Sequence, residues 1–490
     1  MMKASSIFIF LFLFTITTSI SHSDDPSISS VCIIGGGMGG ASVAHFLRRY
    51  STTQIRLFDK NHLVGGRMAT VSIGGDTFEA GASILHPKNY YAKNYTEKYL
   101  NQSIGGNNEE DDDVLGIWDG ERFVFKSFRT DWKVPILRKI VRFVNSLRLF
   151  FRYGFSLFRM FDFVEDTVNK FLKYYEGFET RPVFGTVEEM LKWSGLFNLT
   201  TRPLEEELVD AGLSPLLIQE LVTVITRINY GQSVLMSGLA GAVSLAGSGG
   251  GLWAVKGGNW QMAATLINSS DVLLHLKEEV ESISNLGHSY ELNTTEGKSY
   301  TCEVTVVATP LDELNIQFHP EISIPERKLQ HTYTTFIRGL LNPAYFGLDS
   351  VADIPKLVGT IETPNVPFSC ISVLKKYSEK DMTYKMFSRQ PMAEELLDKI
   401  FSVRNETIKI NWAAYPQYHA PETFAPFILD GQHLYYVNAF ENAASTMETS
   451  AVAAENIARL IISRFATEKS RDLSNLRSFG HDAPEMHVDL

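Results

Sequence analysis

The stretch VCIIGGGMGGASVA, from Val31 to Ala44, decides the fold of this 490-residue chain. An apolar run ends in the pattern Gly35-x-Gly37-x-x-Gly40 and continues directly into a segment with a helical pattern. In such a strand–turn–helix unit the first glycine permits the tight turn, the second lets a pyrophosphate approach the backbone, and the third lets helix and strand pack closely. The N–H groups at the helix N-terminus then face the phosphates. The stretch therefore predicts a dinucleotide site.

The residues after the glycines support this prediction. Gln54–Phe58 has the pattern of a second strand, and Asp59 ends it about 20 residues after the glycines, where a carboxylate binds a ribose hydroxyl. The alternative is a glycine-rich loop beside an ordinary buried strand. Strand, helix and acid together favour a Rossmann-like α/β fold.

A second glycine motif indicates which dinucleotide binds. Leu63–Met68 contains Gly-Gly-Arg, and Thr77–His86 contains a further glycine-rich turn after a short strand. A nicotinamide enzyme has no need of the Gly-Gly-Arg loop, whereas flavoproteins of the amine-oxidase type carry it along the diphosphate and the flavin. The chain resembles that superfamily, and the resemblance implies FAD as the cofactor. The residues that it places at the cofactor in this part of the chain are Asp59, Lys60, Gly65, Gly66, Arg67, Gly81 and Ser83.

Later segments resemble the remaining pieces of such a domain. Asp271–Ile283 resembles the strand that passes the adenine, with the backbone of Val280 as the contact. Thr305–Pro310 resembles the strand and turn that return beside the flavin. Their order along the chain matches a cofactor domain that is assembled from separated segments.

The C-terminal part resembles the segment that closes over the flavin. Leu434–Phe440 is predicted to be a strand, and it leads into a helix predicted from Ser450 to Phe465. A helix that starts there stabilises the anionic end of the flavin. Met447 and Glu448 lie where the resemblance places backbone contacts with the cofactor.

These segments define the expected architecture, which is an α/β protein with a Rossmann-like FAD-binding domain and an inserted α+β substrate domain, as in amine oxidases and the dissociation inhibitors of GTPases. We expect the first part of the insertion to be largely helical. The expected boundaries are a signal peptide at 1–23, an FAD-binding domain at 28–90, 251–312 and 431–468, a substrate-binding domain at 91–250 and 313–430, and a flexible tail at 469–490.

The N-terminal sequence, the net charge and the sequons indicate which classes of function the chain can have. A basic start, a short apolar core and a small-residue exit are typical of a secretory signal peptide. The formal charge of −11 argues against nucleic acid as a partner, and no metal-ligand cluster is visible. Six Asn-x-Ser/Thr sequons agree with a lumenal route. Their asparagines are Asn94, Asn101, Asn198, Asn268, Asn293 and Asn405.

Three cysteines are too few for a disulfide framework in a chain of this length. Cys32 lies inside the first predicted strand, and we expect it to be a buried thiol. The sequence leaves open whether Cys302 and Cys370 pair.

Two apolar segments raise the question of membrane contact. Val234–Val255 carries no charge, but its six glycines favour tight turns in a buried segment. Arg129–Phe161 separates basic residues from aromatic residues when placed on a helix. Such a helix can lie on an anionic membrane, where it would be an entry gate for a lipid. The alternative, which we favour here, is that it packs onto its own domain.

Longer motifs carry a closer resemblance. Phe78–Asn89, Arg227–Gln232, Leu239–Ala246 and Gly251–Trp260 resemble prenylcysteine oxidases, also called farnesylcysteine lyases, and the likeness covers essentially the whole mature chain. It implies oxidative cleavage of a thioether, in which hydride passes from the carbon beside sulfur to the flavin and water adds. The products are a prenyl aldehyde, free cysteine and hydrogen peroxide. It also implies work in lysosomes or vacuoles on the remnants of prenylated proteins.

The reaction requires a long apolar cavity with one polar end. His86 and His419 are candidates for the polar end, although each has a structural alternative in its proline-flanked loop. Glu441 is a candidate for holding the substrate amino group. The competing functions are a polyamine oxidase, a lipid desaturase and a prenyl-binding escort protein without turnover. The sequence does not distinguish farnesyl from geranylgeranyl substrates.

Overall fold

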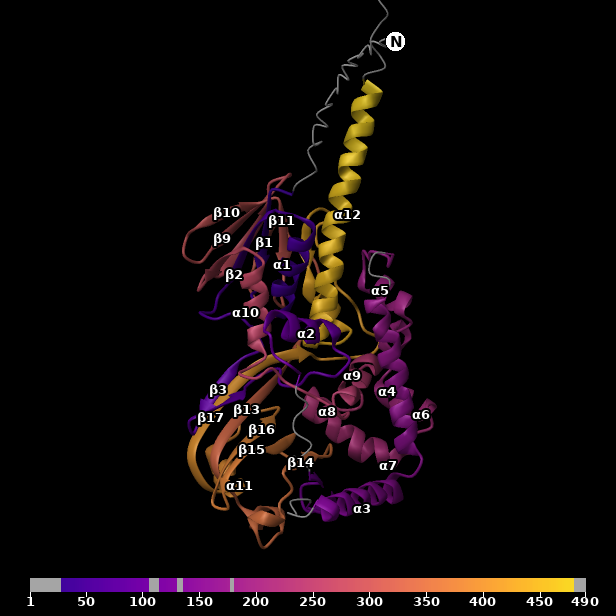
Figure 1. Cartoon of the computed structure of the whole chain (residues 1–490), viewed down its shortest axis with the longest axis vertical. Coiled ribbons are helices and arrows are strands. Elements are labelled where there is room, and N and C mark those ends of the chain that lie inside the picture. Colours follow the sequence, from indigo (N-terminus) through magenta and orange to yellow (C-terminus); the bar gives the residue numbers. More distant parts are fainter. Residues whose placement is uncertain (1–27, 105–113, 130–134, 177–179, 480–490) are drawn as a thin grey trace, which may run out of the picture.

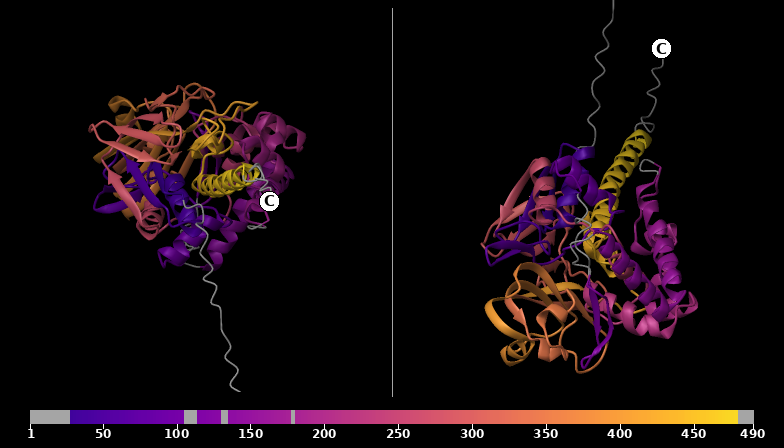
Figure 2. Two further views of the ribbon diagram at one scale, coloured as in Figure 1. Left: turned by 90° about the horizontal axis from the view of Figure 1, so that it is seen from above. Right: turned by 60° about the horizontal axis from the view of Figure 1, so that its bottom comes forward.

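The computed structural model describes residues 28–104, 114–129, 135–176 and 180–479 (Figure 1). The predicted signal peptide at 1–23 lies outside these residues. A parallel sheet with its helices occupies the upper half of the view, and a large sheet and a group of helices lie side by side below it (Figures 1 and 2).

The upper half is built on a parallel sheet in the order β18-β11-β1-β2-β7. Its strands are β1 (Ser30–Ile34), β2 (Gln54–Asp59), β7 (Val272–Leu276), β11 (Val304–Val307) and β18 (Leu434–Tyr436). The central strands are buried on both faces, which explains their unbroken apolar runs. The helices α1 (Met38–Tyr50), α10 (Trp260–Ser269) and α12 (Met447–Phe479) belong to this half, and α1 packs against the other two. The predicted Rossmann-like α/β fold is confirmed.

Three predicted boundaries differ from the structure. Asp271–Ile283 is two strands, because Lys277 adopts a φ of 58° between β7 and β8. The strand predicted from Leu434 ends at Tyr436 and continues as a 3₁₀ helix (Val437–Asn442). The last helix begins at Met447, and it continues through Phe479, past the boundary expected at residue 468.

A second sheet stands beside the first in the order β10-β9-β8-β12. Its strands are β8 (Val280–Asn285), β9 (Tyr290–Thr294), β10 (Ser299–Cys302) and β12 (Gln317–His319). β12 pairs with β8, so this sheet extends past the boundary expected at residue 312. A short hairpin, β3 (Thr70–Ile73) and β4 (Asp76–Glu79), follows the glycine loops.

The lower half contains a seven-stranded sheet in the order β17-β13-β16-β15-β14-β5-β6. Its strands are β5 (Leu115–Trp118), β6 (Phe123–Lys126), β13 (Leu329–Leu341), β14 (Leu357–Thr360), β15 (Cys370–Ser378), β16 (Asp381–Ser388) and β17 (Phe401–Pro416), and α11 (Glu394–Ile400) precedes the last of them. β5 and β6 come from the segment expected to be largely helical, and they extend a sheet whose other strands lie more than 200 residues later.

The remaining helices lie beside this sheet. They are α2 (Tyr90–Asn94), α3 (Pro135–Tyr153), α4 (Ser156–Leu172), α5 (Val187–Ser194), α6 (Leu204–Asp210), α7 (Pro215–Leu217), α8 (Thr223–Asn229) and α9 (Gly238–Ala246). The uncharged Val234–Val255 segment contains α9, most of which is buried as expected. Among the described helices, none combines the length and apolarity needed to cross a bilayer.

The expectation that Cys32 is a free thiol was wrong, and the open question of whether Cys302 pairs with Cys370 is answered. Cys32 is bonded to Cys302 rather than being a free thiol, and Cys370 is the free and buried one. Cys302 ends β10 just before β11, which pairs with β1, so the two sheets bring together cysteines 270 residues apart. Spacing along the chain gives no sign of this proximity.

Candidate active site

One cavity of about 1260 Å³ lies between the two halves of the molecule. Its walls include the Gly35 loop, the start of α12, the face of the large sheet and residues of α4 and α9. The volume exceeds the roughly 300–1,000 Å³ of a typical small-molecule site. It therefore has room for an extended cofactor and a second ligand.

The glycine loop has the geometry of a backbone cradle. Gly35 has a φ of 109°, and a Cβ there would lie 2.6 Å from the carbonyl oxygen of Ala308. A Cβ on Gly40 would overlap the carbonyl oxygen of Gly35. At Gly37 the nearest protein atom to a Cβ would be 3.8 Å away. Packing thus requires glycine at Gly35 and Gly40, whereas the bare backbone at Gly37 leaves space for a ligand at the start of α1, which has no side-chain cap.

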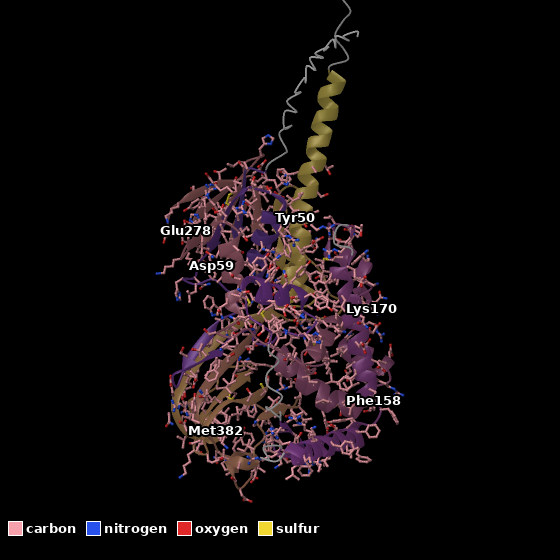
Figure 3. All side chains as sticks on the ribbon, viewed as in Figure 1. Tyr50, Asp59, Phe158, Lys170, Glu278 and Met382 are labelled. Carbon is pink, nitrogen blue, oxygen red and sulfur yellow. A yellow bond between two sulfur atoms is a disulfide. The ribbon has the colours of Figure 1, made fainter. Side chains whose placement is uncertain are left out.

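Asp59 ties this loop to the end of β2. Its Oδ2 accepts a 2.8 Å hydrogen bond from the Gly36 N–H, and its Oδ1 accepts from the N–H of Asn61. The carboxylate is buried, and Oδ1 also accepts from the Asn61 side-chain amide, so Oδ2 is the oxygen that keeps a lone pair for a ligand hydroxyl. Figure 3 labels Asp59 and Glu278 in the same part of the upper half. The Glu278 N–H donates a hydrogen bond to the Asp59 carbonyl. Lys60 and Val280 line the same end of the cavity.

The second glycine motif lies directly against the first. The Gly65 N–H donates to the Gly36 carbonyl at 2.8 Å, and Gly66 has a φ of 57°. A Cβ on Gly81 would overlap the carbonyl oxygen of Arg67, so the two loops pack backbone to backbone. The Ser83 hydroxyl donates to the Gly81 carbonyl at 2.7 Å. The residues of both predicted cofactor loops thus meet in one wall of the cavity.

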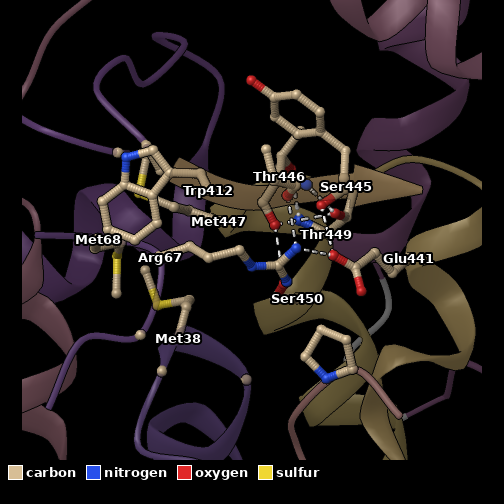
Figure 4. Close-up of a pocket in the computed structure, with 18 of the residues that line it drawn as sticks. Met38, Arg67, Met68, Trp412, Glu441, Ser445, Thr446, Met447, Thr449 and Ser450 are labelled. Atoms are coloured by element: carbon tan, nitrogen blue, oxygen red, sulfur yellow. Dashed lines mark hydrogen bonds and ion pairs between the residues drawn. The ribbon is translucent and has the colours of Figure 1, made fainter. Parts of the chain in front are cut away.

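A buried carboxylate holds Arg67 in this wall. Glu441 pairs with Arg67 and accepts a hydrogen bond from Ser445 (Figure 4). It also pairs with Arg327 and accepts a hydrogen bond from Asn438. Burial opposes its ionisation, but the two arginines hold its pKa near 2. The carboxylate is therefore saturated by the protein itself. Glu441 positions Arg67 and is not available for a substrate amino group, which corrects the role expected from the sequence.

Removing the charge at this position should destabilise the fold. In Glu441→Gln the partly buried Arg67 and Arg327 lose their common buried anion, and we expect the free energy of unfolding to fall by about 3 kcal/mol. Urea unfolding monitored by circular dichroism measures the change. The control is Glu379→Gln, which removes the exposed partner of Lys376 and should cost less than about 0.5 kcal/mol. Equal losses in the two variants would contradict this role of Glu441.

The start of α12 completes the wall. The Thr446 hydroxyl accepts a 2.9 Å hydrogen bond from the Thr449 N–H and so caps the helix, and both residues lie near Arg67 in Figure 4. Met447 lines the cavity as the first helical residue. The Glu448 carboxylate instead accepts from the N–H groups of Tyr91 and Ala92, at 2.7 and 3.0 Å. The Glu448 side chain therefore holds the start of α2, and its backbone is the part that is left for the cofactor contact expected from the sequence.

Sequence reasoning missed the charged pair in the cavity. Lys385 on β16 is buried, and its Nζ donates to the Glu79 carbonyl and to the Ser83 hydroxyl, both at 2.9 Å. Burial lowers the pKa of Lys385 to about 8 and raises that of Glu79 to about 7. Within the described structure the Glu79 Oε2 has no hydrogen-bond partner. Glu79 stands inside the Phe78–Asn89 motif, but Lys385 lies in a strand 300 residues later and carries no motif of its own.

The two histidines differ in position. His86 lines the cavity, its Nδ1 accepts from the Lys88 N–H at 3.1 Å, and burial lowers its pKa. It is thus a neutral turn residue at the cavity wall. His419 is exposed, lies outside the cavity lining and donates its backbone N–H to Glu422. The structure does not bring His419 to the site.

Two family models match the chain. A model described as prenylcysteine lyase covers residues 137–473, and a model described as an NAD(P)-binding Rossmann-like domain covers residues 33–102. The second match falls on the glycine loop, β2 and the second glycine motif.

Characterised relatives align over most of their length. The chain is 64% identical over 461 residues to a farnesylcysteine lyase of Arabidopsis thaliana, covering 93% of this chain and 92% of the relative. It is 33% identical to human prenylcysteine oxidase 1, covering 89% of each.

Solved structures share the fold at low identity. A putrescine oxidase bound to putrescine superposes with a TM-score of 0.57 at 12% identity, covering 89% of this chain and 99% of that one. A cyclohexylamine oxidase from Brevibacterium oxydans gives 0.56 at 17%, covering 90% and 100%. These similarities concern the fold alone.

Proposed function

The chain belongs to the prenylcysteine lyase family, and from this premise we propose that it is an FAD-dependent oxidase that cleaves S-prenyl-L-cysteine. The products would be a prenyl aldehyde, free cysteine and hydrogen peroxide, with oxygen and water consumed. The observation that carries the proposal is the cavity that joins a dinucleotide cradle to apolar helix faces and to the buried Lys385 ammonium. The relatives are named for this substrate class.

The residues present fit FAD. The space over Gly37 and the open start of α1 suit a diphosphate, and the Asp59 Oδ2 keeps a lone pair for a ribose hydroxyl. Lys60 and Val280 line the end expected for the adenine, and Arg67, Gly81 and the start of α12 line the end expected for the flavin ring. When bound, FAD would supply the acceptor for a hydride from the carbon between the sulfur and the allylic double bond.

The apolar wall suits an isoprenoid chain. It comprises side chains of α4 and α9 with neighbouring aliphatic residues, namely Val168, Phe171, Leu172, Leu239, Ala242, Val243, Ile84, Ile228 and Leu252. Such a wall binds a long hydrocarbon by burying its surface and excludes bulk water from the reacting carbon.

The polar end suits an amino acid. The Lys385 ammonium fits the substrate carboxylate. The Ser83 hydroxyl fixes the lysine beside the Gly81 turn, next to the loop that carries Arg67. A substrate held at both ends would present its carbon–sulfur bond at the flavin end of the cavity. This geometry requires no strong base.

A substrate panel tests the function. The purified protein should release hydrogen peroxide and a prenyl aldehyde from S-farnesylcysteine and S-geranylgeranylcysteine, and neither product from putrescine or a free fatty acid. Peroxide from putrescine alone would instead indicate a polyamine oxidase. Tight binding of prenylcysteine without any product would indicate an escort protein.

We also propose that the protein works in the lumen of the secretory pathway, in a lysosome or vacuole, with peripheral membrane contact through residues 129–161. The basic and apolar N-terminal sequence and the sequons support this location. Five sequon asparagines are exposed, namely Asn94, Asn101, Asn198, Asn268 and Asn405. Exposure at these positions supports glycosylation.

The buried carboxyls predict a preference for acidic solution. Burial raises the pKa of Glu422 to about 8 and the pKa values of Glu79 and Glu448 to about 7, above the usual 4.5. The folded chain therefore holds these protons to higher pH than the unfolded chain, so stability falls as pH rises from 4.5 towards 8. Burial lowers the pKa of His45 to about 4, and this shift lowers the stability of the fold only below pH 6.5.

We therefore expect a higher thermal midpoint at about pH 6 than at about pH 8, because these buried carboxyls give up in this interval the protons that the folded chain holds more tightly than the unfolded chain. Differential scanning calorimetry of the flavin-loaded protein measures the difference. A midpoint that rises with pH over this range would contradict the prediction.

A further inference from the structure

An apolar ridge stands on the outside of the molecule where α3 meets α4. We define it by nine exposed side chains, namely Ile136, Leu137, Ile140, Phe143, Leu147, Phe151, Phe155, Phe158 and Phe161. Phe151 is 81% exposed and Phe155 is 70% exposed. Figure 3 shows Phe158 at the outer edge of the helices. On α3 the ridge residues recur every three or four positions, so they form one stripe along the helix.

The opposite side of α3 faces the protein. Arg152 donates two hydrogen bonds to the Glu220 carboxylate, at 2.6 and 2.5 Å. Arg148 donates to the Lys126 carbonyl at 2.8 Å, and Asn145 exchanges two hydrogen bonds with the backbone of Phe128. An amphipathic helix normally buries its apolar stripe. Here the helix packs onto its own domain, as we expected, but through polar bonds that leave the apolar stripe facing outward.

The charge around the ridge has one sign. The sequence from Pro135 to Phe161 contains five arginines, one lysine and no acid, although the chain as a whole carries −11. Lys139, Arg142 and Arg159 are exposed beside the ridge. Large apolar side chains with adjoining cations are typical of surfaces that lie in the headgroup region of an anionic bilayer.

A second copy of the chain suits the ridge less well. In a two-fold symmetric contact the same patch meets itself, so these cations would face their own copies across the interface. Like charges placed opposite each other disfavour association. Anionic lipid headgroups instead complement them.

From these observations we infer that the apolar ridge docks the protein on a bilayer that contains anionic lipid, and that α4 leads the substrate from the bilayer to the cavity. The inference rests on the proposed function, because S-prenylcysteine is an amphiphile that partitions into membranes. α4 carries Phe158 and Phe161 near its start, and Thr167, Val168 and Phe171 near its end line the cavity. From Phe158 to Phe171 the helix rises about 20 Å.

Vesicle binding tests the docking surface without turnover. The full-length protein should co-sediment with vesicles of phosphatidylcholine and phosphatidylserine, and less with phosphatidylcholine alone. The double variant F151S/F155S should weaken binding at least about tenfold, because two exposed aromatic anchors are lost. Leu286→Ser, which changes a 57% exposed leucine on the β8–β9 connection, is the matched control and should bind as the parent does.

Turnover separates the two proposals. F151S/F155S should cleave S-farnesylcysteine dispersed in detergent as the parent protein does, and it should cleave vesicle-embedded substrate at least about tenfold more slowly. Unchanged vesicle binding by this variant would overturn the inference while leaving the proposed function intact. So would a dimer in analytical ultracentrifugation that F151S/F155S dissociates. Vesicle binding without cleavage of any S-prenylcysteine would instead retain the docking surface and refute the function.

Discussion

Replacing Gly37 by valine should give a folded protein that no longer retains its flavin. The Cβ would have no protein neighbour nearer than 3.8 Å, and Gly37 has a φ of −80°, which valine adopts without strain. The added side chain would instead occupy the space over the loop where the diphosphate lies in our proposal. We expect the affinity for FAD to fall at least about 100-fold, which corresponds to about 2.7 kcal/mol.

Flavin content and folding are measured separately in this experiment. The absorbance ratio at 450 and 280 nm reports bound flavin, and circular dichroism reports the fold. Gly250→Val is the matched control, because a Cβ at Gly250 meets nothing within 4 Å and Gly250 lies outside the cavity lining. If the Gly37→Val protein remained yellow, the diphosphate of FAD would not lie over Gly37, and the proposed position would be wrong.

Replacing Lys385 by methionine should lower kcat/KM for S-prenylcysteine by about 100- to 1,000-fold. The substitution leaves the apolar stem of the side chain but removes the ammonium that we assign to the substrate carboxylate. Removing one partner of a buried charged hydrogen bond costs about 2–5 kcal/mol. Because the contact is made in the bound substrate before reaction, we expect most of the loss to appear in KM.

The pH profile distinguishes this role from a structural one. Burial lowers the Lys385 pKa to about 8, so the parent enzyme should lose activity above pH 8 as the ammonium deprotonates. Lys385→Arg should recover part of the activity and move that alkaline limit upward, since a guanidinium stays charged. Lys375→Met should leave the pH profile unchanged. Lys375 is a half-exposed lysine on β15 that pairs with Asp76 on β4. An unaltered KM in Lys385→Met would contradict the assignment.

The backbone geometry of the glycine loops could be predicted from the sequence because its determinants are local. The bare backbone of Gly35, Gly37 and Gly40 and the acid at the end of β2 follow from turn geometry within about 30 residues of chain. The Gly-Gly-Arg loop lies against the first glycine loop, as the resemblance implied. Such features require only the strand–turn–helix order, which the periodicity of the residues reveals.

The substrate side could not be predicted in the same way because its contacts join distant segments. Lys385 reaches Glu79 across 306 residues, and Glu441 is neutralised by Arg67 and Arg327 from two other segments. Neither pairing leaves a pattern along the chain. The orientation of α3 was also hidden, because helical periodicity separates two faces without showing which of them meets the protein. Glu220, which holds Arg152 inward, lies 68 residues away.

Anaerobic mixing with S-farnesylcysteine is the sharpest test of the proposed reaction. We predict that the purified protein carries bound FAD, that its 450 nm absorbance bleaches on mixing, and that farnesal and cysteine appear in equal amounts. Gly37→Val protein should show no such change. A flavin-loaded protein whose absorbance stays constant with every S-prenylcysteine, or a colourless protein that FAD cannot reconstitute, would contradict the account.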